Sequence, residues 1–480
     1  MIELHSFYID GRWVAPAALT PCEVIDPSTE AVFATVALGG EADTDRAVAA
    51  AKAAFPGWSS APLETRLAAL ERLVVAYERR ADELGSAISR EMGAPIDMAK
   101  SAQVGAGIAH LRHFIERARR FEFEGWLEPG DTAHRLIRDP IGVCGLITPW
   151  NWPMNQILLK VTPALLTGCT VILKPSEIAP LSGQIFAEMV HEAGFPAGVF
   201  NLLHGDGAGV GSRLTAHPDV DMISFTGSTR AGIAISRNAA ATVKRVSLEL
   251  GGKGANILFA DADAAAVERG LGSCFYNSGQ GCNAPSRMFV HRDIYDAVVD
   301  RAARIAGEVA VRPASEPGDH LGPVVSARQF EHIQKMISAG IEEGARLVAG
   351  GLGRPDGLER GYFVRPTVFA DVTNEMSVAR EEIFGPVVVI LPFETEGEAI
   401  AMANDTVYGL TNYVQTRDMD RARRVARALR SGMVEINGVG RRLSTPFGGF
   451  KQSGNGREGG NWGIEEFLEV KAVSGWNAAS

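Results

Sequence analysis

One cysteine in a polar, glycine-rich segment is the first residue of this chain whose setting suggests chemistry. Cys282 stands in the run NSGQGCN, residues 277–283, directly after a helical pattern. A free thiol titrates near pH 8.5, so a nucleophilic cysteine needs amide dipoles or a base that raises its thiolate fraction. A glycine-flanked turn offers such amides. The alternative is a small buried hydrophobe, which is our interpretation of the other four, Cys22, Cys144, Cys169 and Cys274.

Two other side chains could serve the same reaction. Glu249 is flanked by two leucines in the run SLELGGK, at the end of a strand pattern. Burial there would raise its pKa towards the range in which a general base works best. Asn151 follows the strand-like run 141–148, at the end where open α/β sheets place their ligands, and its amide could stabilise an oxyanion. A solvent-facing glutamate and an ordinary turn asparagine remain the alternatives.

Segments that follow other strands carry groups suited to a dinucleotide. A carboxylate at Glu177, beside Lys174, would accept bonds from a ribose 2′-hydroxyl and repel a 2′-phosphate, which favours NAD over NADP. A solvated ion pair is the alternative. The run TGST at 226–229 places amides and hydroxyls at a helix N-terminus, where phosphate binds readily. The glycine-rich run 205–211 does not fit G-x-G-x-x-G, so an orthodox Rossmann fingerprint is absent.

The elements that must position these groups follow from the hydrophobic pattern. Beyond Asp139, short apolar runs alternate with helical ones, which is typical of a parallel sheet covered on both faces, and the alternation resumes after Gly254. Upstream, the spacing predicts one long helix over 62–92. The segment 121–139 and the tail after Gly460 fit neither core. We interpret them as an oligomerisation arm, with two surface excursions that fold back on their own chain as the alternative.

Composition excludes several classes of protein. The 480 residues suggest about three structural units, and the formal charge of −10 disfavours a nucleic-acid or anionic-membrane partner. Five scattered cysteines without a CxxC predict thiols in a reducing cytoplasm. We expect no signal peptide and no membrane span. His110 and His113 form an HxxH on an arginine-rich helix, which we interpret as a solvated face rather than a metal site.

The order of these motifs closely resembles the NAD(P)-dependent aldehyde dehydrogenase superfamily. The run EEIFGP at 381–386 follows the thiol, and the likeness extends from FYIDG near the start to PFGGFK at 446–451. The resemblance implies an α/β fold with a Rossmann-like cofactor domain, a second α/β catalytic domain and a small β arm, assembled as a homodimer or homotetramer. The implied boundaries are 1–120 and 140–252 for the cofactor domain, 253–455 for the catalytic domain, and 121–139 and 456–480 for the arm.

The resemblance also implies a role for each motif. Cys282 matches the nucleophile, Glu249 the general base and Asn151 the oxyanion amide of an NAD-dependent oxidation of an aldehyde to a carboxylic acid. The implied route runs through a thiohemiacetal and a thioester that water hydrolyses. A CoA-acylating enzyme and a cysteine esterase that uses no dinucleotide are the alternatives. The implied cofactor contacts are Thr148, Trp150, Lys174, Glu177, Gly207, Gly227, Ser228, Glu382 and Phe384.

The expected substrate pocket combines the segment after Asn151 with the loop before Pro446. These segments supply Trp152, Asn155, Gln156, Arg441 and Arg442. Two arginines at a pocket mouth suggest an aldehyde that carries a carboxylate or another acceptor, because guanidinium forks bind such groups bidentately. A solvated arginine pair on a loop is the alternative. We expect a small-molecule aldehyde as the substrate and no bound metal.

Overall fold

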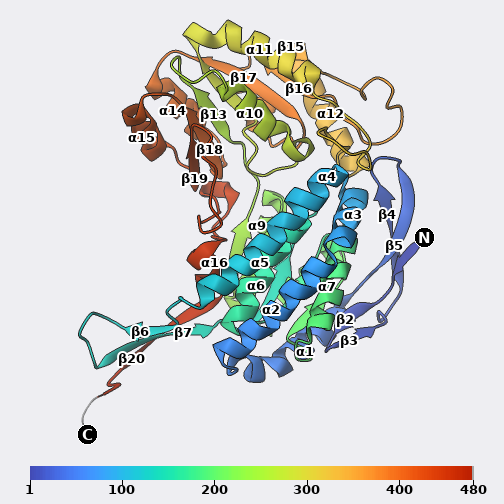
Figure 1. Cartoon of the computed structure of the whole chain (residues 1–480), viewed down its shortest axis with the longest axis vertical. Helices are drawn as coiled ribbons and strands as arrows, with labels where there is room; N and C mark the ends of the chain where they lie inside the picture. The colour runs from blue at the N-terminus through green and yellow to red at the C-terminus, as the bar shows by residue number, and fades with distance from the viewer. Residues whose placement is uncertain (478–480) are drawn as a thin grey trace.

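A parallel sheet forms the centre of the larger half of the computed structural model, which describes residues 1–477 (Figure 1). Its strand order is β12-β11-β8-β9-β10-β2-β3, and the first five strands are parallel neighbours. The hairpin of β2 and β3 adds an antiparallel edge. The strands are β2 (Phe7–Ile9), β3 (Arg12–Val14), β8 (Val143–Ile147), β9 (Thr170–Lys174), β10 (Phe200–Leu202), β11 (Met222–Thr226) and β12 (Arg245–Glu249).

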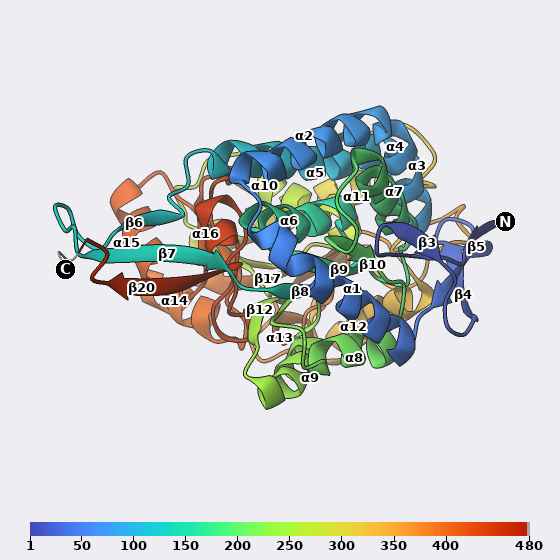
Figure 2. The ribbon, with the colours of Figure 1, turned by 90° about the horizontal axis from the view of Figure 1, so that it is seen from below.

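Helices cover both faces of this sheet and bury its apolar strands. The helix α6 (Pro153–Thr167) begins at a proline, whose missing N–H costs nothing in a first turn, and ends at Gly168 in the left-handed region with φ 103°. Nearly every residue of α6 is buried, because α6 lies between the sheet and the outer helices (Figure 2). The other helices of this half are α1 (Glu41–Ser59), α2 (Leu63–Arg79), α3 (Ala81–Met92), α4 (Ile96–Met98), α5 (Val104–Ala118), α7 (Leu181–Ala193), α8 (Ser212–Ala216), α9 (Thr229–Ala239) and α16 (Gly460–Glu465).

A second sheet organises the other half, in the order β15-β16-β17-β14-β13-β18-β19. All its neighbours are parallel except β15 and β16. Its strands are β13 (Ala255–Leu258), β14 (Arg287–His291), β15 (Arg346–Ala349), β16 (Thr367–Ala370), β17 (Val387–Phe393), β18 (Thr411–Gln415) and β19 (Met433–Ile436). Its helices are α10 (Ala266–Phe275), α11 (Tyr295–Glu308), α12 (Ala327–Glu342), α13 (Ser377–Arg380), α14 (Glu396–Asn404) and α15 (Met419–Ala428).

Two segments far apart in the sequence form a projecting arm. The strand β20 (Leu468–Ser474) pairs antiparallel with β7 (His134–Pro140) over seven residue pairs, and β6 (Glu124–Trp126) pairs with the other edge of β7. Figures 1 and 2 show this sheet extending away from both larger sheets. The preceding helix α16 packs against α5 and α6 instead, so the start of the 456–480 tail belongs to the body of the molecule.

The fold confirms the α/β class and the two parallel-sheet units, and it corrects the prediction of one helix over 62–92. That stretch is two helices, because Arg80 leaves the helical region at φ −104°, ψ 14° and pairs with Glu83 and Glu188. A small sheet of β1 (Ile2–Leu4), β5 (Ala31–Leu38) and β4 (Thr20–Asp26) was not predicted.

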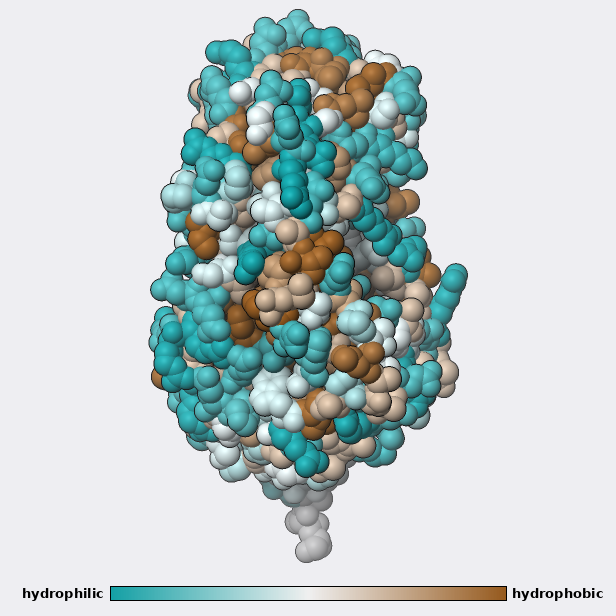
Figure 3. Space-filling model, turned by 90° about the vertical axis from the view of Figure 1, so that its right-hand side faces the viewer, coloured by the Kyte–Doolittle hydropathy of each residue, from teal (hydrophilic) through white to brown (hydrophobic). Residues whose placement is uncertain are grey.

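Figure 3 shows one face on which hydrophilic side chains are interspersed with small apolar groups. Across residues 1–477, every helix is too short or too polar to cross a membrane.

Candidate active site

The loop that carries Cys282 is held in an unusual backbone conformation. Asn277 and Ser278 lie in the left-handed region, with φ of 54° and 57°, which surrounding contacts must enforce in residues other than glycine. Ser278 Oγ donates to the Gly322 carbonyl at 2.8 Å. Gly279 follows with φ 75°, and a Cβ there would lie 2.0 Å from the carbonyl carbon of Gly385. Only glycine fits so close to another backbone, so the loop is fixed against the segment that leads into β17 before it reaches the thiol.

The same loop fixes Asn151. The Asn277 side chain donates to the Asn151 carbonyl at 2.9 Å, and Gln103 donates to it at 3.1 Å. The Asn151 amide in turn donates to the Gln280 carbonyl at 3.0 Å. Because an asparagine amide carries two N–H donors, one remains for a ligand. Asn151 is therefore a pre-oriented donor, as an oxyanion site requires.

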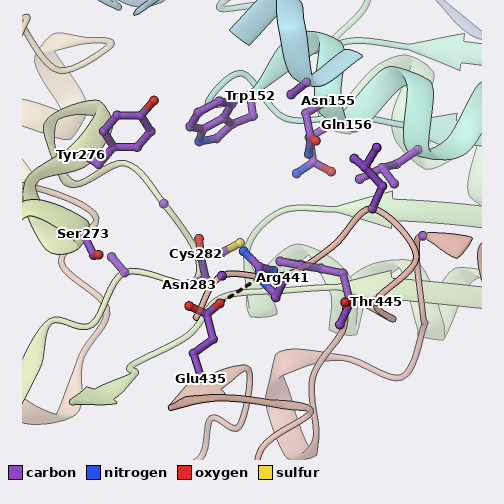
Figure 4. Close-up of a pocket in the computed structure, with 18 of the residues that line it drawn as sticks. Trp152, Asn155, Gln156, Ser273, Tyr276, Cys282, Asn283, Glu435, Arg441 and Thr445 are labelled. Atoms are coloured by element: carbon purple, nitrogen blue, oxygen red, sulfur yellow. Dashed lines mark ion pairs between the residues drawn. The ribbon is translucent and has the colours of Figure 1, made fainter. Parts of the chain in front are cut away.

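Cys282 and Asn151 lie where two cavities meet. Both residues line a cavity of about 600 Å³ and a second cavity of about 1380 Å³. Figure 4 shows the smaller cavity opening on Cys282, with Trp152, Gln156 and Arg441 around it. A group at this junction is accessible to two ligands at once.

The larger cavity brings together all nine of the expected cofactor residues. Its lining includes Thr148, Trp150, Lys174, Glu177, Gly207, Gly227, Ser228, Glu382 and Phe384. Lys174 and Glu177 form an ion pair, with Nζ and Oε2 3.4 Å apart, but the Lys174 side chain is only 4% exposed, so this is not the solvated pair of the alternative interpretation.

Several features of this cavity fit a dinucleotide. Ser228 caps α9, which directs the positive end of that helix and its free amides at the cavity, as a pyrophosphate requires. The hydroxyls of Thr148 and Thr226 are buried and have no hydrogen-bond partner within residues 1–477, so both are available to a ligand. A Cβ built on Gly207 would meet no atom within 4 Å, so the backbone is open there.

Glu382 and Phe384 close the end of this cavity near the thiol. Glu382 accepts from the Gly252 amide at 2.9 Å, and burial raises the pKa of its carboxyl to about 7. Phe384 is held at φ 56° by Gln329, whose amide donates to its carbonyl at 3.0 Å. Its ring meets Trp150 edge-on, with centroids 5.5 Å apart. The two aromatic rings define a fixed wall beside the junction.

Glu249 ends strand β12 as a buried carboxylate, which excludes the solvent-facing alternative. The residue is 2% exposed, and neither carboxylate oxygen has a hydrogen-bond partner among the described residues. Burial raises its pKa well above the usual range, and the nearby carboxylate of Glu458 raises it further. A Cβ on Gly448 would lie 2.6 Å from Oε1, so glycine is needed to admit the side chain. Glu249 is absent from the lining of either cavity.

The thiol of Cys282 is protonated in this environment. Burial raises its pKa to about 12, and the carboxylates of Glu382 and Glu249 raise it as well. Glu249 is thus close enough to influence the thiol electrostatically. Attack by this sulfur requires a group that accepts its proton, and a buried carboxylate with a raised pKa is well matched to that task.

The smaller cavity has an aromatic mouth. Trp152 and Tyr276 stack at 5.8 Å with a tilt of 31° between their planes, and Gln156 lies on the same wall. Arg441 lines the cavity, but it forms an ion pair with Glu435, with Nε and Oε1 3.0 Å apart, a partner that the sequence did not suggest. Arg442 is exposed at the rim.

The interpretation of His110 as part of a solvated helix face is wrong. His110 is partly buried and lines the smaller cavity, and burial lowers its pKa to about 4. The spacing of His110 and His113 gave no indication of this, because the histidine faces a cavity formed by distant segments.

Sequence reasoning also missed the residues that hold the site together. Gln103, Gln280 and Gln329 fix the backbones of Asn151, Val325 and Phe384 by side-chain hydrogen bonds. Each glutamine acts over a sequence separation of 45 residues or more, as the three bonds show. Gln280 lies inside the thiol run, which was the one available signal.

Comparison with known proteins matches this arrangement to one family. The model of the aldehyde dehydrogenase family matches residues 13–473. This chain belongs to the aldehyde dehydrogenase family. Among its relatives, 3-succinoylsemialdehyde-pyridine dehydrogenase of a Pseudomonas species is 51% identical, with both chains covered completely.

Solved aldehyde dehydrogenases have the same fold along the whole chain. The enzyme of Bartonella henselae is 56% identical with a TM-score of 0.98, over 99% of this chain and 100% of that one. Aldehyde dehydrogenase C of Pseudomonas syringae, solved as a cysteine-to-alanine mutant with NAD+ and octanal, is 49% identical with a TM-score of 0.97. That comparison covers 99% of this chain and 98% of the other.

Proposed function

We propose that this aldehyde dehydrogenase oxidises an uncharged aldehyde to a carboxylic acid with NAD+, through a covalent intermediate on Cys282. The single observation that carries the proposal is that Cys282 and Asn151 line both cavities. A thiol at that junction contacts an aldehyde on one side and a nicotinamide on the other. The complex of Pseudomonas syringae aldehyde dehydrogenase C with NAD+ and octanal supports this pairing of ligands.

The first half of the reaction forms a bond between Cys282 Sγ and the aldehyde carbon. The thiol proton passes to a base, for which Glu249 has the raised pKa and the proximity. The carbonyl oxygen becomes an oxyanion, which the free amide N–H of Asn151 and the backbone N–H of Cys282 stabilise. NAD+, when bound, accepts the hydride that this carbon releases. Lys174, Glu177, Ser228 and Glu382 would hold it by its riboses and pyrophosphate.

The second half releases the acid from the enzyme. Once the proton taken from the thiol has passed from Glu249 to solvent, Glu249 removes a proton from water and the resulting hydroxyl adds to the thioester carbon. The carbon–sulfur bond then breaks, and the proton on Glu249 returns to the sulfur to regenerate the thiol. Glu249 does not line either cavity, so its side chain must rotate towards the junction to reach the water. Rotation breaks no hydrogen bond to a described residue, because both oxygens lack such partners.

The substrate proposal follows from the shape and charge of the smaller cavity. Its mouth is aromatic, and its Arg441 is already paired with Glu435. An aliphatic or aromatic tail without charge fits such a wall, and this replaces the carboxylate-bearing aldehyde expected from two arginines. The relatives support it, since one is solved with octanal and another is named for a semialdehyde on a pyridine.

We also propose the domain division and the assembly implied by the sequence. The division 1–120 with 140–252, 253–455, and 121–139 with 456–480 is supported by the two seven-stranded sheets and the sheet of the arm, except that α16 packs on the first body. The exposed edge strand β20 offers unpaired backbone groups for a homodimer or homotetramer. Five free cysteines within the described residues support a cytoplasmic location.

The test is the appearance of reduced nicotinamide absorbance when aldehydes are added with NAD+. Octanal, heptanal and an aryl-substituted propanal should each yield NADH and acid in equal amounts, and Cys282→Ser should yield neither. Release of NADH only when coenzyme A is present would identify an acylating enzyme. Ester hydrolysis that survives Cys282→Ser, with no NADH from any aldehyde, would refute the proposal.

A further inference from the structure

Arg441 and Glu435 form an ion pair on the wall of the smaller cavity (Figure 4). The side chains are 28% and 15% exposed, so the pair is partly shielded from solvent. Glu435 comes from β19, and Arg441 from the loop that follows that strand. The guanidinium also lies over the Phe447 ring at 4.7 Å, while Nη1 contacts the Met433 sulfur at 3.3 Å. Neighbouring side chains therefore already contact one edge and one face of the Arg441 guanidinium.

The other basic groups of the cavity do not replace Arg441 as a carboxylate site. Burial lowers the pKa of His110 to about 4, so its ring is neutral at neutral pH. Arg442 is exposed at the rim, where solvent and salt screen its charge. Within the described lining, Arg441 is therefore the cation best placed to bind a substrate carboxylate, since its side chain is only 28% exposed, and Glu435 already neutralises it.

A carboxylate on the substrate would have to compete with Glu435 for the same guanidinium. Two carboxylates beside one cation repel each other, and the incoming one would also lose its hydration. An uncharged tail meets neither cost and gains contact with Trp152, Tyr276 and Phe447, which line the same cavity.

We propose that Glu435 determines the charge selectivity of this enzyme, because it withholds Arg441 from carboxylate-bearing aldehydes. The inference rests on the aldehyde oxidation proposed above and names the residue that restricts its substrates. Neutralising Glu435 should expose a guanidinium fork next to the reacting centre, which then favours the aldehydes that the wild type rejects.

The test compares kcat/KM for 5-oxopentanoate with kcat/KM for heptanal, two aldehydes of equal size. In the wild type, we expect a ratio below about 0.1, since the charged tail has no free partner. Glu435→Gln should raise the ratio by about tenfold or more, mainly through a lower KM for 5-oxopentanoate, as expected for a hydrogen bond to a charged group. The double variant Glu435→Gln with Arg441→Gln should return the ratio to within about threefold of the wild type.

A control removes an ion pair whose residues do not line the cavity. Glu396 pairs with Arg424 at 3.0 Å, and Glu396→Gln should leave the ratio unchanged. A wild-type ratio above one, an unchanged ratio in Glu435→Gln, or a gain that persists in the double variant overturns the proposal. If Glu435→Gln does not fold, the double variant still tests the proposal. A ratio far below that of the wild type would overturn it, because it would show that Arg441 already binds the substrate carboxylate in the wild type. Absence of NADH from either aldehyde in the wild type contradicts the proposed function instead.

Discussion

Replacing Asn151 with alanine removes one oxyanion donor while leaving the cofactor cavity nearly intact. The Asn151 amide has one N–H committed to the Gln280 carbonyl and one left for the substrate oxygen. Loss of a single oxyanion-hole donor typically costs about 3–4 kcal/mol, which corresponds to a reduction in kcat of roughly 10²–10³-fold. Both halves of the reaction pass through an oxyanion, so the loss should appear in the first-turnover rate and in kcat.

The assay is the rate of NADH formation with octanal at saturating NAD+, measured in the first turnover and at steady state. The Kd for NAD+, from quenching of protein fluorescence, should change by less than about threefold, because one lining group among many is lost. Gln103→Leu is the matched control: it removes a hydrogen bond to the Asn151 carbonyl but keeps the amide, so kcat should fall less than about tenfold.

Either of two results would contradict the role of Asn151 as an oxyanion donor. A kcat for Asn151→Ala within about threefold of the wild type would show that no oxyanion depends on this amide. Equal losses in kcat and in NAD+ affinity would show that the residue holds the cofactor cavity together rather than the developing charge.

Two further predictions concern buried carboxylates. Glu458 pairs with Lys160, and its carboxylate raises the pKa of Glu249. Glu458→Gln should therefore lower the pKa of Glu249 and move the acid limb of the kcat–pH profile to lower pH. An acid limb that stays in place or moves to higher pH contradicts this coupling. Glu91 accepts hydrogen bonds from two backbone amides of α7, and burial raises the pKa of its carboxyl to about 7. Because this pKa is higher in the folded than in the unfolded protein, Glu91 contributes fully to stability below its unfolded pKa, and the contribution is lost as pH rises through 7. Wild-type stability should therefore fall by about 3 kcal/mol from this group between pH 4.5 and 8, and urea midpoints of Glu91→Gln should show a smaller fall; equal falls contradict the assignment.

The sequence could predict those parts of the fold whose pattern is local. Strands β8, β9, β11 and β14 are buried on both faces, so they appear as short apolar runs of the kind from which the parallel sheets were predicted. Strand β18 shows no such run because it buries polar residues: Asn412 accepts from the Ala255 amide at 2.9 Å, and Gln415 donates to Asn256 at 3.1 Å. Burial of that kind depends on partners from other strands, which hydropathy cannot show.

The residues of the candidate site could likewise be predicted only in part. The thiol run and the residues at strand ends could be found because chemistry restricts which residue types stand there. The turn of His110 into the cavity depends on how α5 packs against distant segments, so the sequence suggested a solvated helix face instead. Arg441 and Glu435 are close in the sequence, but no residue pattern indicated that the two side chains pair. The arm was recognised as two polar or unpartnered segments, but the pairing of β7 with β20 joins residues over 300 positions apart.

Mass spectrometry of Glu249→Gln, quenched after one turnover with NAD+ and octanal, tests the roles of Cys282 and Glu249 most directly. Because solvent must then take the thiol proton in place of Glu249, this variant should release its first NADH more slowly than the wild type. Release should stop after about one NADH per active site, since nothing then activates the water. Cys282 should carry the octanoyl group as a thioester, and Cys282→Ser should carry none. Full steady-state turnover by Glu249→Gln, or an acyl group on any other residue, would contradict these roles of Cys282 and Glu249.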